Sequence, residues 1–244
     1  MAESVTMPPL PQAPLLAISN LQAWYDESHV LHGVNFEVNA GEVVTLLGRN
    51  GAGKTTTLKS IMGLMRQRKG SVIFEGEQLI GMPARKIARK GVAICPEERC
   101  IFSSLNVEEN LMLPPQVKSG GMSLTQIFDM FPNLKERLRS QGTKLSGGEQ
   151  QMLAIARILR TGSRMLLLDE PTEGLAPVII QHIGNTIKQL KRQGFTIVLV
   201  EQNFRFASSV ADRHYVVELG KVVDMIPNDQ VDTAATKIEA YLGV

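Results

Sequence analysis

The apolar residues of this chain fall into two patterns, and each pattern predicts one kind of element. Short, nearly continuous apolar runs are typical of buried strands, whereas apolar residues spaced three and four positions apart are typical of amphipathic helices. The first pattern predicts strands at residues 16–25, 34–38, 42–47, 70–74, 92–95, 164–170, 195–200, 214–218 and 221–226. The second pattern predicts helices at residues 56–65, 82–89, 177–192, 204–210 and 230–242. Strands that alternate with helices in this way indicate an α/β domain.

The pattern changes in the middle of the chain, where short amphipathic helical pieces replace the alternation. These pieces lie at residues 107–112, 124–130 and 134–138, and a longer helical stretch follows up to residue 159. We therefore expect a helical subdomain at about residues 98–159, inserted into a core of about residues 15–97 and 160–244. The first 14 residues contain four of the twelve prolines and little else that could pack, so we expect a disordered tail there.

Composition narrows the classes of protein that this chain could belong to. A chain of 244 residues with 43% hydrophobic content can bury the core of one α/β domain. The 26 basic and 24 acidic residues are spread along the chain and leave a net charge of +2, so we expect no nucleic-acid partner. No apolar run approaches the roughly 18 residues of a membrane span, and no Lys or Arg precedes Arg49, as a signal peptide would require. We therefore expect a cytosolic protein.

The chain contains one strong phosphate-binding motif. Residues 48–56 fit the P-loop pattern G-x-x-x-x-G-K-[ST], in which backbone N–H groups cradle phosphates. In this motif the lysine, here Lys54, reaches the β- and γ-phosphates, and the hydroxyl of the next residue, here Thr55, binds Mg²⁺. A buried strand is predicted before the motif and a helix after it, so that a helix N-terminus faces the phosphates. A chance match has odds on the order of one in a hundred, so a flexible glycine-rich turn is a poor alternative.

Three further segments could contribute to a nucleotide site. Residues 145–151 form a second Ser/Gly-rich helix N-terminus with Ser146 at the N-cap position, although such a segment alone is more often a plain loop. The strand at residues 164–170 ends in Asp169 and Glu170, which suit a magnesium ligand and a group that activates water; a solvated acidic turn is the alternative. One ring of the pair Trp24-Tyr25 could stack on a purine base, because strand neighbours point to opposite faces, or both could simply pack at a strand end.

The P-loop, residues 145–151 and Asp169-Glu170 occur in this order, with the helical insertion before the second motif. In this arrangement the chain resembles the ATP-binding cassette (ABC) ATPases of membrane transporters over about residues 15–226, nearly the whole predicted fold. The resemblance implies a P-loop NTPase fold of the ABC type, with a mixed sheet, a RecA-like core and an inserted helical subdomain. It also implies ATP and Mg²⁺ as cofactors, and a dimer in which the signature loop of one subunit completes the ATP site of the other.

The resemblance implies a role for each residue that matches the family motifs. Tyr25 matches the aromatic residue that stacks on adenine, and Glu170 matches the catalytic base. The implied nucleotide-binding residues are Tyr25, Gly48, Asn50, Gly51, Gly53, Lys54, Thr55, Thr56, Glu97, Ser146, Gly147, Gly148 and Glu149. The implied metal-binding residues are Thr55, Glu97 and Asp169, and the implied catalytic residues are Lys54, Glu170 and Gln202.

Three positions depart from the usual family pattern. Glu97 replaces a glutamine that senses Mg²⁺ and the attacking water, Ala176 replaces an aspartate, and Gln202 replaces a switch histidine. The segments around these positions resemble the ATPases of branched-chain amino acid uptake systems and their urea and amide relatives. Such importers combine a periplasmic binding protein, two membrane permease subunits and two different ATPases. The resemblance thus implies a heterodimer with a second ABC ATPase, attached to permeases at the cytoplasmic face of the inner membrane.

Alternative functions belong to other classes of P-loop protein. Soluble cassette ATPases that act on ribosomes or DNA usually carry two cassettes, long coiled-coil insertions or basic extensions, and the sequence has none of these. A GTPase or a small-molecule kinase would leave residues 145–151 unused, and the sequence has no Asn-Lys-x-Asp segment to read a guanine base. Within the favoured class, residues 99–105 are expected to form part of a groove for a permease helix. Phe102 is either its exposed anchor or a core residue of the helical subdomain.

Overall fold

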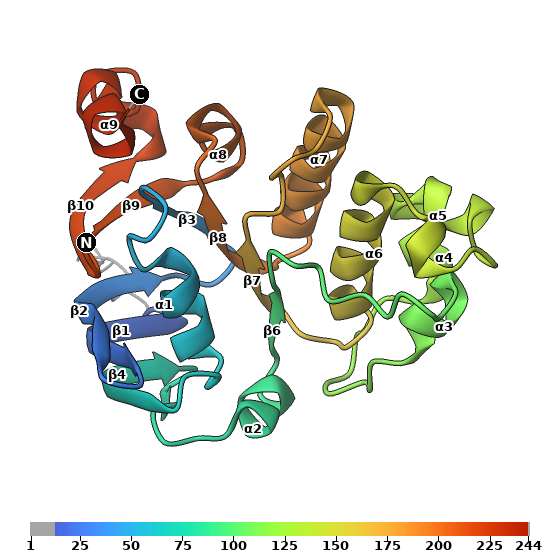
Figure 1. The fold of residues 1–244 in the computed structure, drawn as a ribbon, viewed down its shortest axis with the longest axis horizontal. Coiled ribbons are helices and arrows are strands. Elements are labelled where there is room, and N and C mark those ends of the chain that lie inside the picture. Colours follow the sequence, from blue (N-terminus) through green and yellow to red (C-terminus); the bar gives the residue numbers. More distant parts are fainter. Residues whose placement is uncertain (1–12, 244) are drawn as a thin grey trace, which may run out of the picture.

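The computed structural model describes residues 13–243, so residues 1–12 of the predicted tail lie outside the described residues. The larger sheet has six strands (Figure 1). In spatial order they are β10 (Lys221–Pro227), β9 (Arg213–Glu218), β3 (Val43–Leu47), β8 (Thr196–Glu201), β7 (Met165–Asp169) and β6 (Val92–Cys95). Neighbouring strands are parallel except for β10, which runs antiparallel to β9. The predicted α/β fold with a mixed sheet is therefore confirmed.

The strands at the centre of this sheet are continuous apolar runs because both faces are covered. Every residue of β3, β7 and β8 is buried, as expected for parallel strands between two layers. The covering helices include α1 (Lys54–Ile61), α2 (Ala84–Arg89), α7 (Pro177–Arg192) and α8 (Phe204–Val210). Two large hydrophobic clusters result, one toward the helical insertion and one between the two sheets.

A smaller antiparallel sheet lies beside α1 (Figure 1). Its strands are, in order, β2 (Ser28–Val38), β1 (Leu16–Tyr25), β4 (Gln67–Phe74) and β5 (Glu77–Gln78). The strand predicted at residues 34–38 is longer in the structure, because a two-residue turn at Asp26-Glu27 lets β2 pair with β1 over almost its whole length. The hydrophobic pattern missed the first part of β2 because the segment 28–33 contains polar residues and the pattern indicates only strands that are buried.

The segment between β6 and β7 is helical, and Figure 1 shows it on the side of the molecule away from the small sheet. It contains α3 (Val107–Met112), α4 (Leu124–Met130), α5 (Pro132–Glu136), a 3₁₀ turn (Gly142–Lys144) and α6 (Gly147–Leu159). Reciprocal capping boxes fix where α3, α4 and α6 begin, with Asn106, Ser123 and Ser146 as the N-cap residues. The buried face of α6 joins the cluster on the sheet, so this helix links the insertion to the core.

The C-terminal segment differs from the sequence prediction. A 3₁₀ turn (Asn228–Gln230) precedes α9 (Ala235–Leu242), so the helix predicted at residues 230–242 begins later. Helix α9 ends at Gly243, which adopts a left-handed conformation. Within residues 13–243, no helix combines the length and the apolar character needed to cross a membrane.

Candidate nucleotide-binding site

The P-loop connects β3 to α1 in a conformation that requires glycine. Gly48 and Gly53 have φ angles of 155° and 106°. A Cβ at Gly48 would lie 2.2 Å from the carbonyl oxygen of Val217, and one at Gly53 would lie 2.8 Å from Leu31 Cδ2. Because Gly53 is also the N-cap of α1 and has no side chain to cap it, the first N–H groups of the helix are left for an anion.

The order of the large sheet gathers the other predicted residues around this loop. Since β3, β8, β7 and β6 are parallel neighbours, the segments that follow them meet at one edge of the sheet. The P-loop follows β3 and Gln202 follows β8. Asp169 ends β7, Glu170 comes directly after it, and Glu97 follows β6. Residues far apart in the sequence thus meet here. Glu97 and Glu170 line the cavity described next, whereas Asp169 and Gln202 do not line it and contact residues that do.

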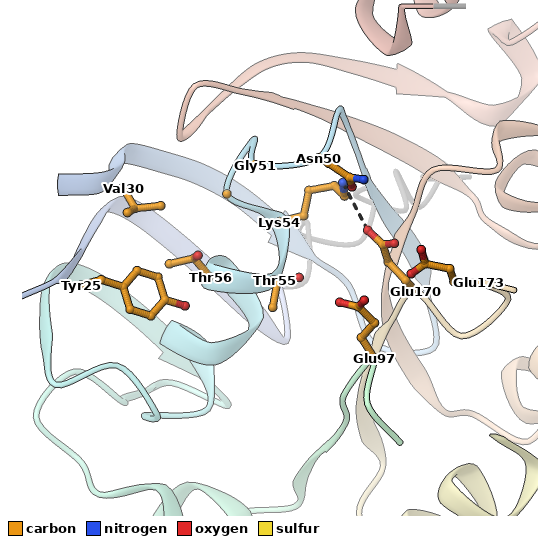
Figure 2. A pocket seen from close by; sticks show the side chains of 11 residues that line it. Tyr25, Val30, Asn50, Gly51, Lys54, Thr55, Thr56, Glu97, Glu170 and Glu173 are labelled. Carbon is orange, nitrogen blue, oxygen red and sulfur yellow. Dashed lines mark ion pairs between the residues drawn. The ribbon is translucent and has the colours of Figure 1, made fainter. Parts of the chain in front are cut away.

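That cavity has a volume of about 430 Å³ (Figure 2), which lies within the usual range for a small-molecule site. It is lined by Tyr25, Val30, Asn50, Gly51, Gly53, Lys54, Thr55, Thr56, Glu97, Glu170 and Glu173. Figure 2 shows Tyr25 at one end, the carboxylates at the other and the P-loop between them. An elongated ligand with an aromatic end and an anionic end fits this arrangement.

The structure decides which aromatic residue faces the cavity. Tyr25 lines it and is 46% exposed, whereas Trp24 stacks on His29 with 4.3 Å between the ring centroids. Lys69 also lies over the Trp24 ring. Tyr25 is therefore the ring that is free to stack on a base.

Lys54 is held between the P-loop backbone and an acidic residue. Its Nζ donates hydrogen bonds to the carbonyl oxygens of Gly48 (2.8 Å) and Arg49 (3.1 Å). It also forms an ion pair with Glu170 Oε1 at 3.4 Å, and the two side chains are only 4% and 8% exposed. The Nζ of Lys54 therefore lies next to the place where phosphates would bind.

Asp169 and Thr55 fit a magnesium site. Thr55 Oγ1 donates to Asp169 Oδ1 at 3.0 Å, and the buried Oδ2 of Asp169 has no hydrogen-bond partner among the described residues. Burial raises the pKa of Asp169 to about 6, and the nearby carboxylates of Glu170 and Glu97 contribute to the shift. Within residues 13–243 no cluster of three His, Cys, Asp or Glu side chains could hold a metal by itself. An ion here would need phosphate oxygens and water as further ligands, which is how Mg²⁺ usually binds nucleotides.

Gln202 joins the P-loop to the acidic pair. Its Nε2 donates to Glu170 Oε2 and to Asn50 Oδ1, both at 2.7 Å. Glu170 has a φ angle of 45°, a conformation that is rare for residues with a side chain. The loops after β7 and β8 are further tied together by Glu201, whose carboxylate accepts hydrogen bonds from both the backbone and the hydroxyl of Thr172. Burial raises the pKa of Glu201.

Two residues of the cavity had been given no role from the sequence. Val30 belongs to the part of β2 that the pattern missed. Glu173 faces Glu170, and a hydrogen bond between the two carboxyl groups, together with burial and the nearby Glu97, raises the pKa of Glu173. The turn after β7 brings Glu173 back to the cavity, and no periodic pattern could have revealed this.

The predicted signature residues Ser146, Gly147, Gly148 and Glu149 do not line the cavity. They form the N-terminus of α6, where Ser146 Oγ accepts from the N–H of Glu149 and Glu149 Oε2 accepts from the N–H of Ser146. Ser146 is exposed, and Glu149 also pairs with Arg137 at 3.3 Å. Within one chain, therefore, the N-terminus of α1 lies at the cavity and the N-terminus of α6 lies outside it.

The fold and the cavity define a P-loop nucleotide triphosphatase. A family model described as "ABC transporter" matches residues 31–173, and the chain belongs to this family as an ATP-binding, ATP-hydrolysing subunit. It is 43% identical to the high-affinity branched-chain amino acid transport ATP-binding protein BraG of Pseudomonas aeruginosa, over 94% of this chain and 100% of the relative. It is 34% identical to the lipopolysaccharide export system ATP-binding protein LptB of Haemophilus influenzae, over 94% of this chain and 97% of the relative.

Solved structures share the fold. A nucleotide-free ATP-binding cassette from an ABC transporter superimposes with a TM-score of 0.82, at 22% identity, over 95% of this chain and 99% of the other. A dimeric ATP-binding cassette in a post-hydrolysis state with ADP and Pi superimposes with a TM-score of 0.78, at 23% identity, over 87% of this chain and 98% of the other. The predicted fold family is confirmed by these likenesses.

Proposed function

We propose that this subunit powers the import of branched-chain amino acids across the inner membrane. The observation that carries the proposal is the likeness to BraG, which is 43% over the whole length of that protein, compared with 34% to the export protein LptB. The segments around Glu97, Ala176 and Gln202 support it, because in the sequence they resemble the ATPases of this branch.

The residues of the cavity suggest how ATP is hydrolysed. The N–H groups at the start of α1 hold the phosphates, and Lys54 moves from Glu170 to the β- and γ-phosphate oxygens. Mg²⁺, when bound, neutralises charge on the phosphates, and Thr55, Asp169 and Glu97 are the residues that would hold it. Once free of Lys54, Glu170 accepts a hydrogen bond from the attacking water and orients it for in-line displacement.

We propose that the complete site forms between two subunits. Ser146 is exposed and the signature residues lie outside the cavity, so a second ABC ATPase can receive them over its own P-loop. The dimeric form of the solved cassette supports this arrangement. Gln202 is neutral and Ala176 lacks a carboxylate, so we propose an asymmetric heterodimer whose partner ATPase carries the more active catalytic set.

The helical segment of about residues 98–159 is proposed as the subdomain that receives a permease helix. Phe102 is 46% exposed and lies against Arg157, with 4.8 Å between the guanidinium carbon and the ring centroid. The fully buried Asn110 fixes the backbone here, since its side chain accepts from the N–H of Phe102 and donates to its carbonyl, each at 2.9 Å. An exposed aromatic ring on a rigid backbone suits docking. The pore would then belong to the permeases, with a periplasmic solute-binding protein acting indirectly and this subunit at the cytoplasmic face.

Uptake in cells tests the proposal. A strain without the chromosomal copy of this chain would be complemented with the parent chain or with Glu170→Gln, and the uptake of radiolabelled leucine and lysine would be measured. We expect the parent chain alone to restore leucine uptake, while lysine uptake stays the same in all strains. Unchanged leucine uptake without the chain would refute the import of branched-chain amino acids, and a defect in lipopolysaccharide export instead would favour the LptB-like alternative.

A further inference from the structure

Arg49, a P-loop residue at one of the variable motif positions, contacts the C-terminal helix. Its Nε donates to the carbonyl oxygen of Tyr241 and its Nη2 to that of Ala240, each at 3.3 Å. Both carbonyls belong to the last turn of α9, where carbonyl groups have no partner within the helix and carry partial negative charge. The guanidinium group therefore caps the end of α9.

Helix α9 is itself fixed to the core. Ile238 is 1% exposed and forms a small hydrophobic cluster with Val216 and Ile226, and Phe204 packs against this cluster. Lys237 Nζ pairs with Asp224 Oδ2 at 2.7 Å on the outer side of the helix. The end of α9 is therefore an attachment point held by contacts that do not involve Arg49.

The contact requires glycine at the end of the helix. Gly243 has a φ angle of 78°, and a Cβ at this position would lie 2.7 Å from Arg49 Cζ. A side chain there would displace the guanidinium group, and because that group is the far end of a flexible side chain, it can move away at little cost to the fold but loses its contact with α9. The absence of a side chain at Gly243 therefore leaves room for the Arg49 guanidinium group.

On its other side, Arg49 does not line the cavity, but its backbone contacts residues that do. Its carbonyl oxygen accepts the hydrogen bond from Lys54 Nζ, and its neighbour Asn50 accepts the hydrogen bond from Gln202. The position of the Arg49 backbone therefore affects both the Lys54 side chain and, through Asn50, the amide of Gln202. A side chain anchored outside the loop reduces the freedom that the loop loses when it binds a ligand.

We propose that Arg49 is a positioning residue that fastens the P-loop to α9, so that the C-terminal helix sets the ATP affinity of the site. The helix acts on the P-loop through the guanidinium group, without touching the nucleotide. A displacement of α9 lowers ATP affinity, and a fixed α9 keeps the loop ready to bind.

The first experiment measures MgATP binding to the full-length chain by isothermal titration calorimetry. Freeing one anchored side chain should raise the dissociation constant for Arg49→Ala roughly three- to tenfold. Arg49→Lys, which keeps a cation able to reach one carbonyl, should recover part of this loss. In the assembled transporter, Arg49→Ala should raise KM while kcat at saturating ATP stays within about twofold of the parent value. Parental affinity for Arg49→Ala would overturn the proposal.

The second experiment uses the glycine at the end of α9. Gly243→Ala should raise the dissociation constant to a similar extent, because its Cβ displaces the guanidinium group. Gly194→Ala is the matched control, since Gly194 has a φ angle of 81° and a Cβ there meets nothing within 4 Å; it carries the same backbone strain without the clash. The double variant Arg49→Ala/Gly243→Ala should bind no more weakly than Arg49→Ala alone. Additive losses would show that Gly243 does not act through Arg49 and would refute the link.

Discussion

Gln202 replaces a histidine that is usual in the family, and its contacts allow the effect of its removal to be worked out. Its Nε2 bridges Glu170 Oε2 and Asn50 Oδ1 at 2.7 Å each, so Gln202→Ala removes the donor that orients the catalytic carboxylate. A hydrogen bond to a charged group contributes about 1.5–3 kcal/mol. If most of this acts in the transition state, kcat should fall roughly 10- to 100-fold, because each 1.36 kcal/mol is a factor of ten.

Steady-state ATP hydrolysis by the assembled transporter measures this change. KM should stay within about threefold of the parent value, because Gln202 reaches the P-loop only through Asn50. Gln202→Glu should lower kcat at least as much, since it places a second carboxylate against Glu170. Gln202→His, which restores a donor that can carry charge, should retain more activity than either variant.

The control is a glutamine outside the site. Gln189 is an exposed residue of α7, and Gln189→Ala should hydrolyse ATP at the parent rate. If Gln202→Ala also kept the parent kcat, the hydrogen bond to Glu170 would have no part in the transition state, and the argument from its geometry would be wrong.

Four further predictions concern the same site and its partners. Glu170→Gln should bind MgATP with near-parental affinity in calorimetry but lose turnover by orders of magnitude, and hydrolysis at the parent rate would exclude Glu170 as the base. Phe102→Ala should weaken co-purification with the permease subunits while ATP affinity stays unchanged; loss of folding in circular dichroism would instead assign Phe102 to the core. The chain purified alone should hydrolyse ATP slowly and accelerate when partner ATPase and permeases are added, so equal turnover at saturating ATP would contradict the asymmetric heterodimer. Because a protonated carboxyl cannot ligate a metal and the pKa of Asp169 is about 6, Mg²⁺-dependent ATP affinity should be full at about pH 7.5 and weaken at about pH 5.5. Calorimetry on Asp169→Asn, which should lack this pH dependence, provides the comparison.

Sequence reasoning was most successful where local pattern and local chemistry agree. The apolar runs of β3, β7 and β8 identify buried strands, because a strand covered on both faces must be apolar at every position. The P-loop motif predicts its own backbone conformation, since Gly48 and Gly53 adopt conformations that leave no room for a side chain. Elements with polar, partly exposed residues were placed less well, as the beginnings of β2 and α9 show.

The sequence by itself determined the P-loop and the acidic pair, and through them the family, because each of these motifs is a run of consecutive residues. The residue pattern left open whether Trp24 or Tyr25 faces the cavity, and the family resemblance favoured Tyr25. The tertiary structure gives the physical reason, which is that Trp24 stacks on His29 while Tyr25 lines the cavity. It also decided that Gln202 meets Asn50, 152 residues earlier in the chain, because β8 pairs directly with β3. The contact between Arg49 and the end of α9 also joins residues that are far apart in the chain and could not be predicted from either segment. Contacts between distant residues follow from strand order and from the conformations of turns, which the hydrophobic pattern of a single segment does not encode.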